Sequence, residues 1–203
     1  MNETEIKQLA AMLQKLDLTA GEAMRRGALP DAILVYEQML DAELRLGLEK
    51  NAGRTRINLA NLYLQVGRNE TALERAGEAI DGLTRCGVAD DAVVARLAKA
   101  RCLCVLDRKH EGVREAETAL RMCRTDLARG EAALTLAECR RLAEDRWKAR
   151  DAVDRAVRYF ESGGDLNGLA RALSLRAAML EQGGQSAAAA ADRARLATIK
   201  SRL

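Results

Sequence analysis

Few side chains in this sequence could take part in metal or redox chemistry. The cysteines are Cys86, Cys102, Cys104, Cys123 and Cys139. They are odd in number and lack the spacing of a disulfide framework or a zinc site. Cys102 and Cys104 are separated by one residue, and on a helix two residues so spaced point to different faces, so they are not expected to hold one ion. We therefore expect no metal site and no cofactor, and interpret the cysteines as reduced thiols of a cytoplasmic protein that are mostly buried.

Catalytic chemistry finds equally little support. His110 is the only histidine, it falls at a predicted helix boundary, and no Gly-rich phosphate loop occurs in the sequence. Acid pairs such as Asp90 and Asp91 stand where helix starts would place them. The sequence therefore predicts a protein that is not an enzyme.

Composition then indicates which elements must position the remaining side chains. Apolar residues make up 48% of the 203 residues and are mostly Ala and Leu, aromatic residues only 2%, and Pro30 is the single proline. Such a mixture favours helices over strands. Charged residues reach 31%, yet the formal net charge is only +3, which argues against a dedicated nucleic-acid-binding protein.

The first residues, Met1 to Glu5, are acidic where a secretory signal would be basic and then apolar. No stretch approaches the length of unbroken apolar sequence that a membrane-spanning helix needs. These features predict a cytoplasmic protein without a membrane partner.

An internal repeat organises the chain. In its clearest copy, Ala60 is followed by Tyr63 three residues later and by Gly67 seven residues later. Small residues follow at Ala72, Ala76 and Ala79. The first small residue of the template recurs at Ala20, Ala60, Ala100, Ala137 and Ala177. These anchors are 40, 40, 37 and 40 residues apart, and a turn signal divides each unit into two helices.

At these residues the sequence resembles the tetratricopeptide repeat family, in the longer-helix version of about forty residues found in kinesin light chains and bacterial signalling-peptide receptors. HEAT-like repeats have a similar period, but they do not explain the small-residue template. The resemblance implies an all-α, right-handed solenoid of five antiparallel helix hairpins, a single array over residues 1–203. The predicted units are 3–47, 48–87, 88–125, 126–163 and 164–203.

The sequence departs from the family pattern in two respects. The third and fourth units lack the Gly between their helices. Lys99 and Arg176 stand where the family prefers Leu, so the third and fifth units are expected to pack less regularly.

The resemblance also implies a concave face lined by the first helix of each hairpin, and this face holds the candidate peptide-binding residues. The candidates are Arg54, Asn58, Asn61, Gln65, Leu97, Arg101, Leu134, Glu138 and Arg141. In the third unit Cys104 is expected to face the same groove. In the last unit the corresponding positions hold Arg171, Ser174, Ala178 and Glu181.

Asn58 and Asn61 carry both a donor and an acceptor, so they could clamp the main chain of an extended peptide without reading its sequence. The arginines of the groove fit either a carboxylate-rich ligand or a merely solvated helix face. Both readings of the arginines stay open at this point.

The predicted function is a non-catalytic adaptor, scaffold or chaperone-like module that binds a segment of another protein or a peptide in its groove. The alternative is a regulatory sensor that binds a small peptide or ligand and changes the shape of its superhelix. The last helix is expected to expose an Ala-rich face with Leu196 and Ile199, which would be available for a homodimer or a partner.

Overall fold

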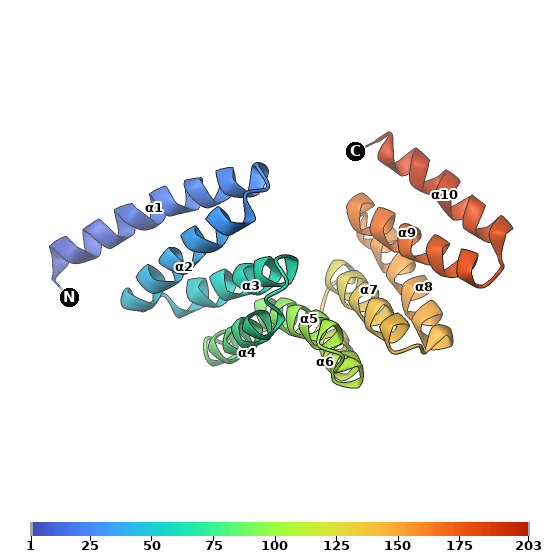
Figure 1. Cartoon of the computed structure of the whole chain (residues 1–203), viewed down its shortest axis with the longest axis horizontal. Helices are drawn as coiled ribbons and strands as arrows, with labels where there is room; N and C mark the ends of the chain where they lie inside the picture. Colours follow the sequence, from blue (N-terminus) through green and yellow to red (C-terminus); the bar gives the residue numbers. More distant parts are fainter. Residues whose placement is uncertain (1, 203) are drawn as a thin grey trace. The chain divides into compact units, whose positions relative to one another are not determined.

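The computed structural model describes residues 2–202, which form ten helices and no strand (Figure 1). The helices are α1 Glu3–Arg25, α2 Leu29–Arg45, α3 Glu49–Gln65, α4 Asn69–Arg85, α5 Ala89–Val105, α6 Lys109–Met122, α7 Asp126–Leu142, α8 Arg146–Gly163, α9 Leu166–Gln182 and α10 Ser186–Lys200. Each predicted repeat unit therefore contains two consecutive helices. The helices divide into two compact units, Met1–Leu106 (unit 1) and Asp107–Leu203 (unit 2), and each is described by itself.

Local sequence signals begin several of these helices. Asn2 and Glu5 form a capping box at the start of α1, with two backbone N–H groups bonded at 2.8 and 2.9 Å. Pro30 lies in the first turn of α2, where its missing N–H leaves no bond unmade. The Thr125 hydroxyl accepts a bond from the Ala128 N–H at the start of α7.

The turn inside each repeat unit has one conformation, whatever residue occupies it. Seven residues after each anchor alanine the backbone is left-handed, with φ of +68° at Gly27, +77° at Gly67 and +73° at Gly184. Asp107 and Glu144 hold the same place in the third and fourth units, with φ of +61° and +62°. The turn therefore keeps its conformation where glycine is replaced, although residues with a side chain disfavour a left-handed backbone.

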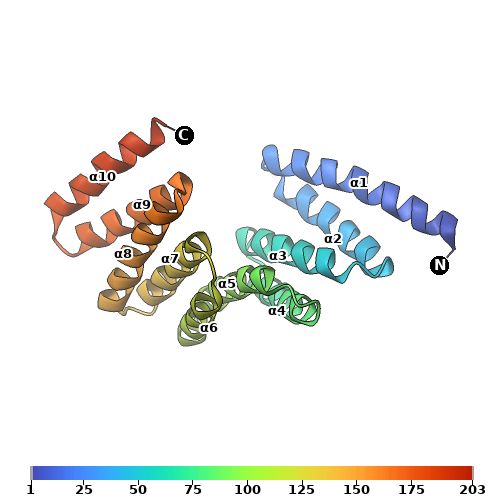
Figure 2. The ribbon, with the colours of Figure 1, turned by 180° about the vertical axis from the view of Figure 1, so that it is seen from behind.

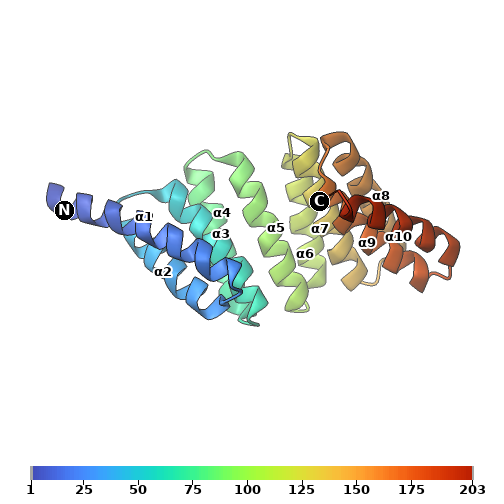
Figure 3. The same ribbon diagram turned by 90° about the horizontal axis from the view of Figure 1, so that it is seen from above.

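In unit 1, α1 to α5 pack in sequence, each helix against the next (Figure 3). Small residues let the helices approach: Ala60 of α3, Ala76 of α4 and Ala98 of α5 form one fully buried cluster. A larger cluster around Leu59 and Tyr63 fills the space between α2 and the later helices.

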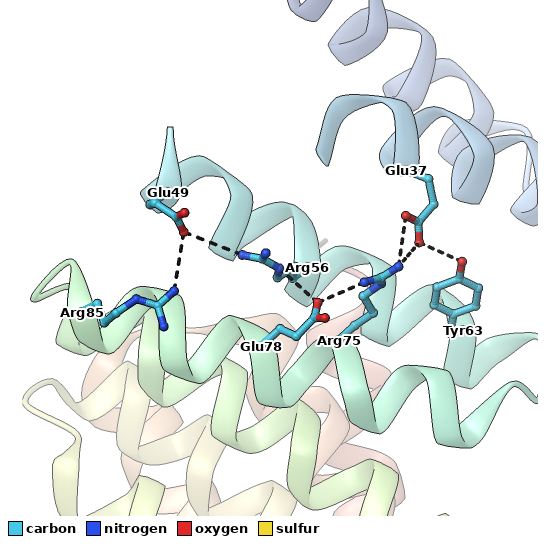
Figure 4. A network of polar contacts seen from close by, with 7 residues as sticks. All are labelled: Glu37, Glu49, Arg56, Tyr63, Arg75, Glu78 and Arg85. Atoms are coloured by element: carbon cyan, nitrogen blue, oxygen red, sulfur yellow. Dashed lines mark hydrogen bonds and ion pairs between the residues drawn. The ribbon is translucent and has the colours of Figure 1, made fainter. Parts of the chain in front are cut away.

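A chain of polar contacts also joins α2, α3 and α4 (Figure 4). The Tyr63 hydroxyl donates to Glu37 at 2.9 Å, and Arg75 reaches Glu37 at 3.3 Å and Glu78 at 3.0 Å. Arg56 lies 3.2 Å from the same Glu78 oxygen, Oε2, that Arg75 contacts. Most members of this network have two partners, so no single ion pair carries it.

In unit 2, the helices α6 to α10 also pack each against the next (Figure 2). Phe160, the only phenylalanine, is fully buried near the end of α8. Its ring lies where a Cβ at Gly130 of α7 or Gly168 of α9 would stand, within 2.7 and 2.3 Å of those positions. Phe160 is therefore a wedge that only two glycines can accommodate.

The short spacing of 37 residues between Ala100 and Ala137 has a local cause. Helix α6 has 14 residues, whereas α4, its counterpart in the preceding repeat, has 17. The chain then turns extended at Cys123 and starts α7 at Asp126. The three missing residues are thus removed from the second helix of the repeat.

Arg176 does not disturb the packing of α9. It forms a two-pronged ion pair with Asp192 of α10, at 2.7 and 2.6 Å, and a third contact with Asp154 of α8 at 3.1 Å. On α10, Ile199 is buried and Leu196 half-buried. The expectation that Ile199 belongs to an exposed pairing face was therefore wrong.

Candidate functional site

The first helices of unit 1 present a polar face across α3 and α5. Arg54 of α3 forms an ion pair with Asp91 of α5 at 2.6 Å, and Arg101 of α5 donates to the Asn61 amide oxygen at 3.2 Å. Asn58 is exposed, and its side chain makes no hydrogen bond within the described residues. Asn58 is thus open to a ligand, whereas the oxygen of Asn61 is already engaged.

Two predicted groove residues are not accessible. Leu97 and Leu134 are 4% and 1% exposed and belong to the core. Both lie three residues before an anchor alanine, where Ile57 is also buried. Cys104, expected to face the groove, is buried as well. Gln65, at the end of α3, is exposed as predicted.

The corresponding face of unit 2 is hollowed between α7 and α9. The hollow has a volume of about 450 Å³. Its lining residues are Glu138, Arg141, Arg171, Ser174, Leu175, Ala178, Met179 and Gln182. The repeat template assigns five of these to the groove, namely Glu138, Arg141, Arg171, Ser174 and Ala178. The structure therefore brings the predicted groove residues of unit 2 together around one space.

Charge in this hollow is only partly neutralised. Arg171 of α9 donates to Glu131 of α7 at 2.8 Å, which links the two helices near their starts. Arg141 is exposed, and the structure gives it no ion pair within residues 2–202. A guanidinium without a carboxylate partner remains available for a ligand acceptor.

A second hollow of about 430 Å³ adjoins the first, with which it shares Arg141, Met179 and Gln182. We call it the Trp147 corner; its lining residues are Arg141, Glu144, Arg146, Trp147, Arg150, Met179, Gln182 and Gly183. Sequence reasoning did not single out this region. The signal was present, since Trp147 is the only tryptophan and its neighbours three and four residues later, Arg150 and Asp151, are polar. A helix with that pattern leaves the tryptophan on its solvent face.

Among residues 2–202, no group of three ligating side chains could hold a metal ion. Burial raises the pKa of the Cys102 thiol to about 11, so this cysteine is a poor nucleophile at neutral pH. Within the same residues, no helix is both long and apolar enough to cross a bilayer.

No protein-family model matches the chain, and no curated protein matches it. Solved structures do share its fold. Aspartyl phosphate phosphatase F from Bacillus subtilis superposes with a TM-score of 0.84 over 98% of this chain and 53% of its own, at 11% identity. A Rap protein complexed with competence and sporulation factor gives 0.81 over 90% of this chain and 52% of its own, at 14% identity. BtubC from P. vanneervenii gives 0.65 over 96% and 91%, at 15% identity.

These likenesses establish the fold class, an all-α helical-repeat solenoid, and confirm that prediction. The chain spans about half the length of the phosphatase and of the Rap protein.

Proposed function

We propose that this protein is a cytoplasmic, non-catalytic interaction module that holds a segment of a partner protein on its first-helix faces. The observation that carries the proposal is the hollow between α7 and α9, which is lined by the residues that the repeat assigns to a groove. Its volume of about 450 Å³ suits several side chains of an extended segment. The tetratricopeptide resemblance supports the same conclusion, because repeats of this kind present such a face to ligands.

The lining chemistry favours a peptide-like ligand over a small apolar one. Arg141 and Gln182 can donate to main-chain or side-chain oxygens, Ser174 and Glu138 can accept, and Ala178 and Met179 offer apolar area. On unit 1, the exposed Asn58 adds a donor and an acceptor suited to the main chain of a peptide. This mixture of charged, hydrogen-bonding and apolar groups is typical of segment recognition.

A regulatory sensor is the second candidate. It is favoured by the Rap protein complexed with competence and sporulation factor, a neighbour of the same fold in a ligand-bound form. An adaptor predicts a small-angle scattering curve that stays the same when the segment binds, whereas a sensor predicts a curve that changes.

Filling the hollow tests the proposal. Ala178 follows an anchor alanine, and the residue at that place in α5 is Arg101, so Ala178→Arg introduces a side chain that this position of the repeat already accommodates. A partner is first captured from the source cell, and its segment is then titrated by calorimetry. We expect Ala178→Arg to weaken binding by at least about tenfold. Arg158→Ala, on an exposed position of α8 outside both hollows, is the matched surface control and should bind as the wild type does.

The Asn58→Ala/Asn61→Ala double variant shows whether unit 1 contributes to the same ligand. Circular dichroism melting must confirm that each variant stays folded. Unchanged affinity in both Ala178→Arg and the double asparagine variant would refute binding on the first-helix faces.

A further inference from the structure

The Trp147 corner combines an exposed aromatic ring with uncompensated positive charge. Trp147 is the second residue of α8, and 79% of its surface is exposed. Tryptophan is a large apolar side chain with one donor, and an exposed one is a frequent anchor of protein interfaces. Because it borders a hollow of about 430 Å³, a ligand group can contact the ring and enter the hollow together.

The apolar part of the corner continues onto α9. Met179, half-buried in the last turn of α9, lines both this hollow and the neighbouring one. A methionine adapts its shape to different apolar groups. Trp147 and Met179 together can therefore receive one large apolar side chain.

The polar part of the corner is positively charged. Its lining contains Arg141, Arg146 and Arg150 against a single acid, Glu144. Arg150 is bonded to Asp154 at 3.3 Å. Arg141 and Arg146 have no ion pair in the described part of the chain, so two guanidinium groups remain free for carboxylates.

We propose that the Trp147 corner binds an acidic segment of a partner protein in which Asp or Glu directly follows a large apolar residue. The apolar side chain packs on Trp147 and Met179, and the carboxylates bond to Arg141 and Arg146. Glu144 disfavours a polyanion such as nucleic acid, because a continuous row of phosphates would meet a carboxylate inside the same hollow. The inference rests on the proposed function, since the corner continues the α7/α9 hollow.

The single tryptophan makes the test specific, because fluorescence excited at the long-wavelength edge, where the three tyrosines do not absorb, reports on Trp147 alone. The probe is the blocked peptide N-acetyl-Gly-Leu-Glu-Glu-amide, whose capped ends remove any terminal carboxylate. We expect a saturable shift of the emission, with a Kd on the order of 0.1–1 mM for so short a peptide. The Leu-Gln-Gln and the Gly-Glu-Glu analogues should each bind at least about fivefold more weakly, because each lacks one half of the recognition.

Variants of the corner locate the site. Arg141→Ala and Arg146→Ala should each weaken binding of the acidic peptide by about three- to tenfold, and Glu144→Gln should strengthen it by removing a repelling carboxylate. Arg158→Ala is the control for loss of a surface arginine and should change nothing. The inference would be overturned if the acidic and Gln peptides bound equally, or if the acidic peptide gave no saturable shift. It would also be overturned if octathymidylate, a short single-stranded DNA that serves as the nucleic-acid probe, bound more tightly than the acidic peptide.

The two proposals fail separately. Suppose that Ala178→Arg abolishes binding of the captured partner, while Arg146→Ala changes neither partner binding nor binding of the acidic peptide. The proposed groove function is then supported, and the Trp147 corner is refuted. If the acidic peptide binds at Trp147 while the partner ignores Ala178→Arg, the corner stands and the groove proposal is refuted.

Discussion

The two units use the same repeat, yet the first helices of neighbouring repeats contact each other differently inside each unit. In unit 1, α3 and α5 contact each other and are joined by the Arg54–Asp91 ion pair and the Arg101–Asn61 hydrogen bond. In unit 2, α7 and α9 touch at few places, and a hollow lies between them. Ala178 occupies the place in α9 that Arg101 occupies in α5, so unit 2 lacks the side chain that joins α5 to Asn61 of α3 in unit 1.

The buried side chain at the same repeat position, which we call the wedge position, also differs in size between the two units. Leu83 and Phe160 both lie 23 residues after their anchor alanines, near the ends of α4 and α8. Leu83 packs against Gly53 of α3 and belongs to a buried cluster with Ala92 and Ala95 of α5, whereas Phe160 packs against glycines on both α7 and α9. Phe160 therefore fills the space that the two glycines leave on the first helices of unit 2.

The largest expected effect on stability comes from truncating the buried side chains Phe160 and Leu83 to alanine. Phe160→Ala should destabilise the protein by about 3–5 kcal/mol, because a fully buried ring leaves a cavity between three helices. Leu83→Ala should cost less, about 2–4 kcal/mol, since fewer atoms are lost. Urea denaturation followed by circular dichroism measures both. A larger cost for Leu83→Ala would contradict the expectation that the larger buried side chain, Phe160, contributes more to stability.

The glycines that face Phe160 provide the matched control. Gly130→Ala and Gly168→Ala should each cost about 1–3 kcal/mol, because the added Cβ would stand within 2.7 and 2.3 Å of the Phe160 ring. Gly77→Ala in α4 adds the same methyl group where no atom lies within 4 Å. It should stabilise the protein by up to about 1 kcal/mol through helix propensity.

The second test compares the polar contacts of the two units. Asp192→Ala should cost about 2 kcal/mol, because it leaves the largely buried guanidinium of Arg176 with Asp154 alone. Arg75→Ala in unit 1 should cost under about 1 kcal/mol, since Glu37 keeps Tyr63 and Glu78 keeps Arg56. Thermal melting distinguishes these outcomes. The double variant Arg176→Leu/Asp192→Leu should recover most of the loss, because no charge is then buried without a partner.

Much of this fold is predictable from the sequence because the repeat constrains it at every level. The anchor alanines predict where helices approach, and the turn signals predict the breaks between them. The groove was less predictable. Leu97 and Leu134 share their repeat position with Ser174, and only the serine is exposed, so residue type rather than repeat position distinguishes core from groove.

The hollow itself depends on packing that no repeat template contains. The hollow lies between α7 and α9, and its lining includes the short side chain of Ala178. The Trp147 corner lies where the α7–α8 turn meets the end of α9. Trp147 and Met179 are 32 residues apart along the chain. The template does not align such residues, so sequence reasoning could not bring them together.

A third test concerns the one acid at the wedge position. Glu43 of α2 also lies 23 residues after its anchor, and it is 5% exposed. Burial raises its pKa above the ordinary value of 4.5, although a hydrogen bond with Thr55 and the nearby Arg56 charge lower it. The folded state therefore binds this proton more tightly than the unfolded state, so stability decreases as the pH rises from 4.5 through the folded pKa.

Glu43→Gln removes that cost and should raise stability at about pH 7 by up to about 1 kcal/mol. The gain should disappear well below the ordinary carboxyl pKa of 4.5, where Glu43 is protonated in both the folded and the unfolded state. Glu74→Gln, at an exposed position of α4, is the control. A gain that is the same at both pH values would show that titration of Glu43 is not its cause.

The smallest effect is expected at the turns, where unit 1 has Gly67 and unit 2 has Glu144 in one left-handed conformation. Glu144→Gly should stabilise the protein by about 0.5–1 kcal/mol, because glycine adopts this conformation without strain. Asp107→Gly should gain less, since aspartate tolerates the left-handed region better than glutamate. Glu144→Gln keeps the strain and removes only the charge, so it should leave the melting temperature unchanged while strengthening binding of the acidic peptide. If Glu144→Gln stabilised the fold as much as Glu144→Gly, charge repulsion at the Trp147 corner, and not the backbone, would be the cost at this turn.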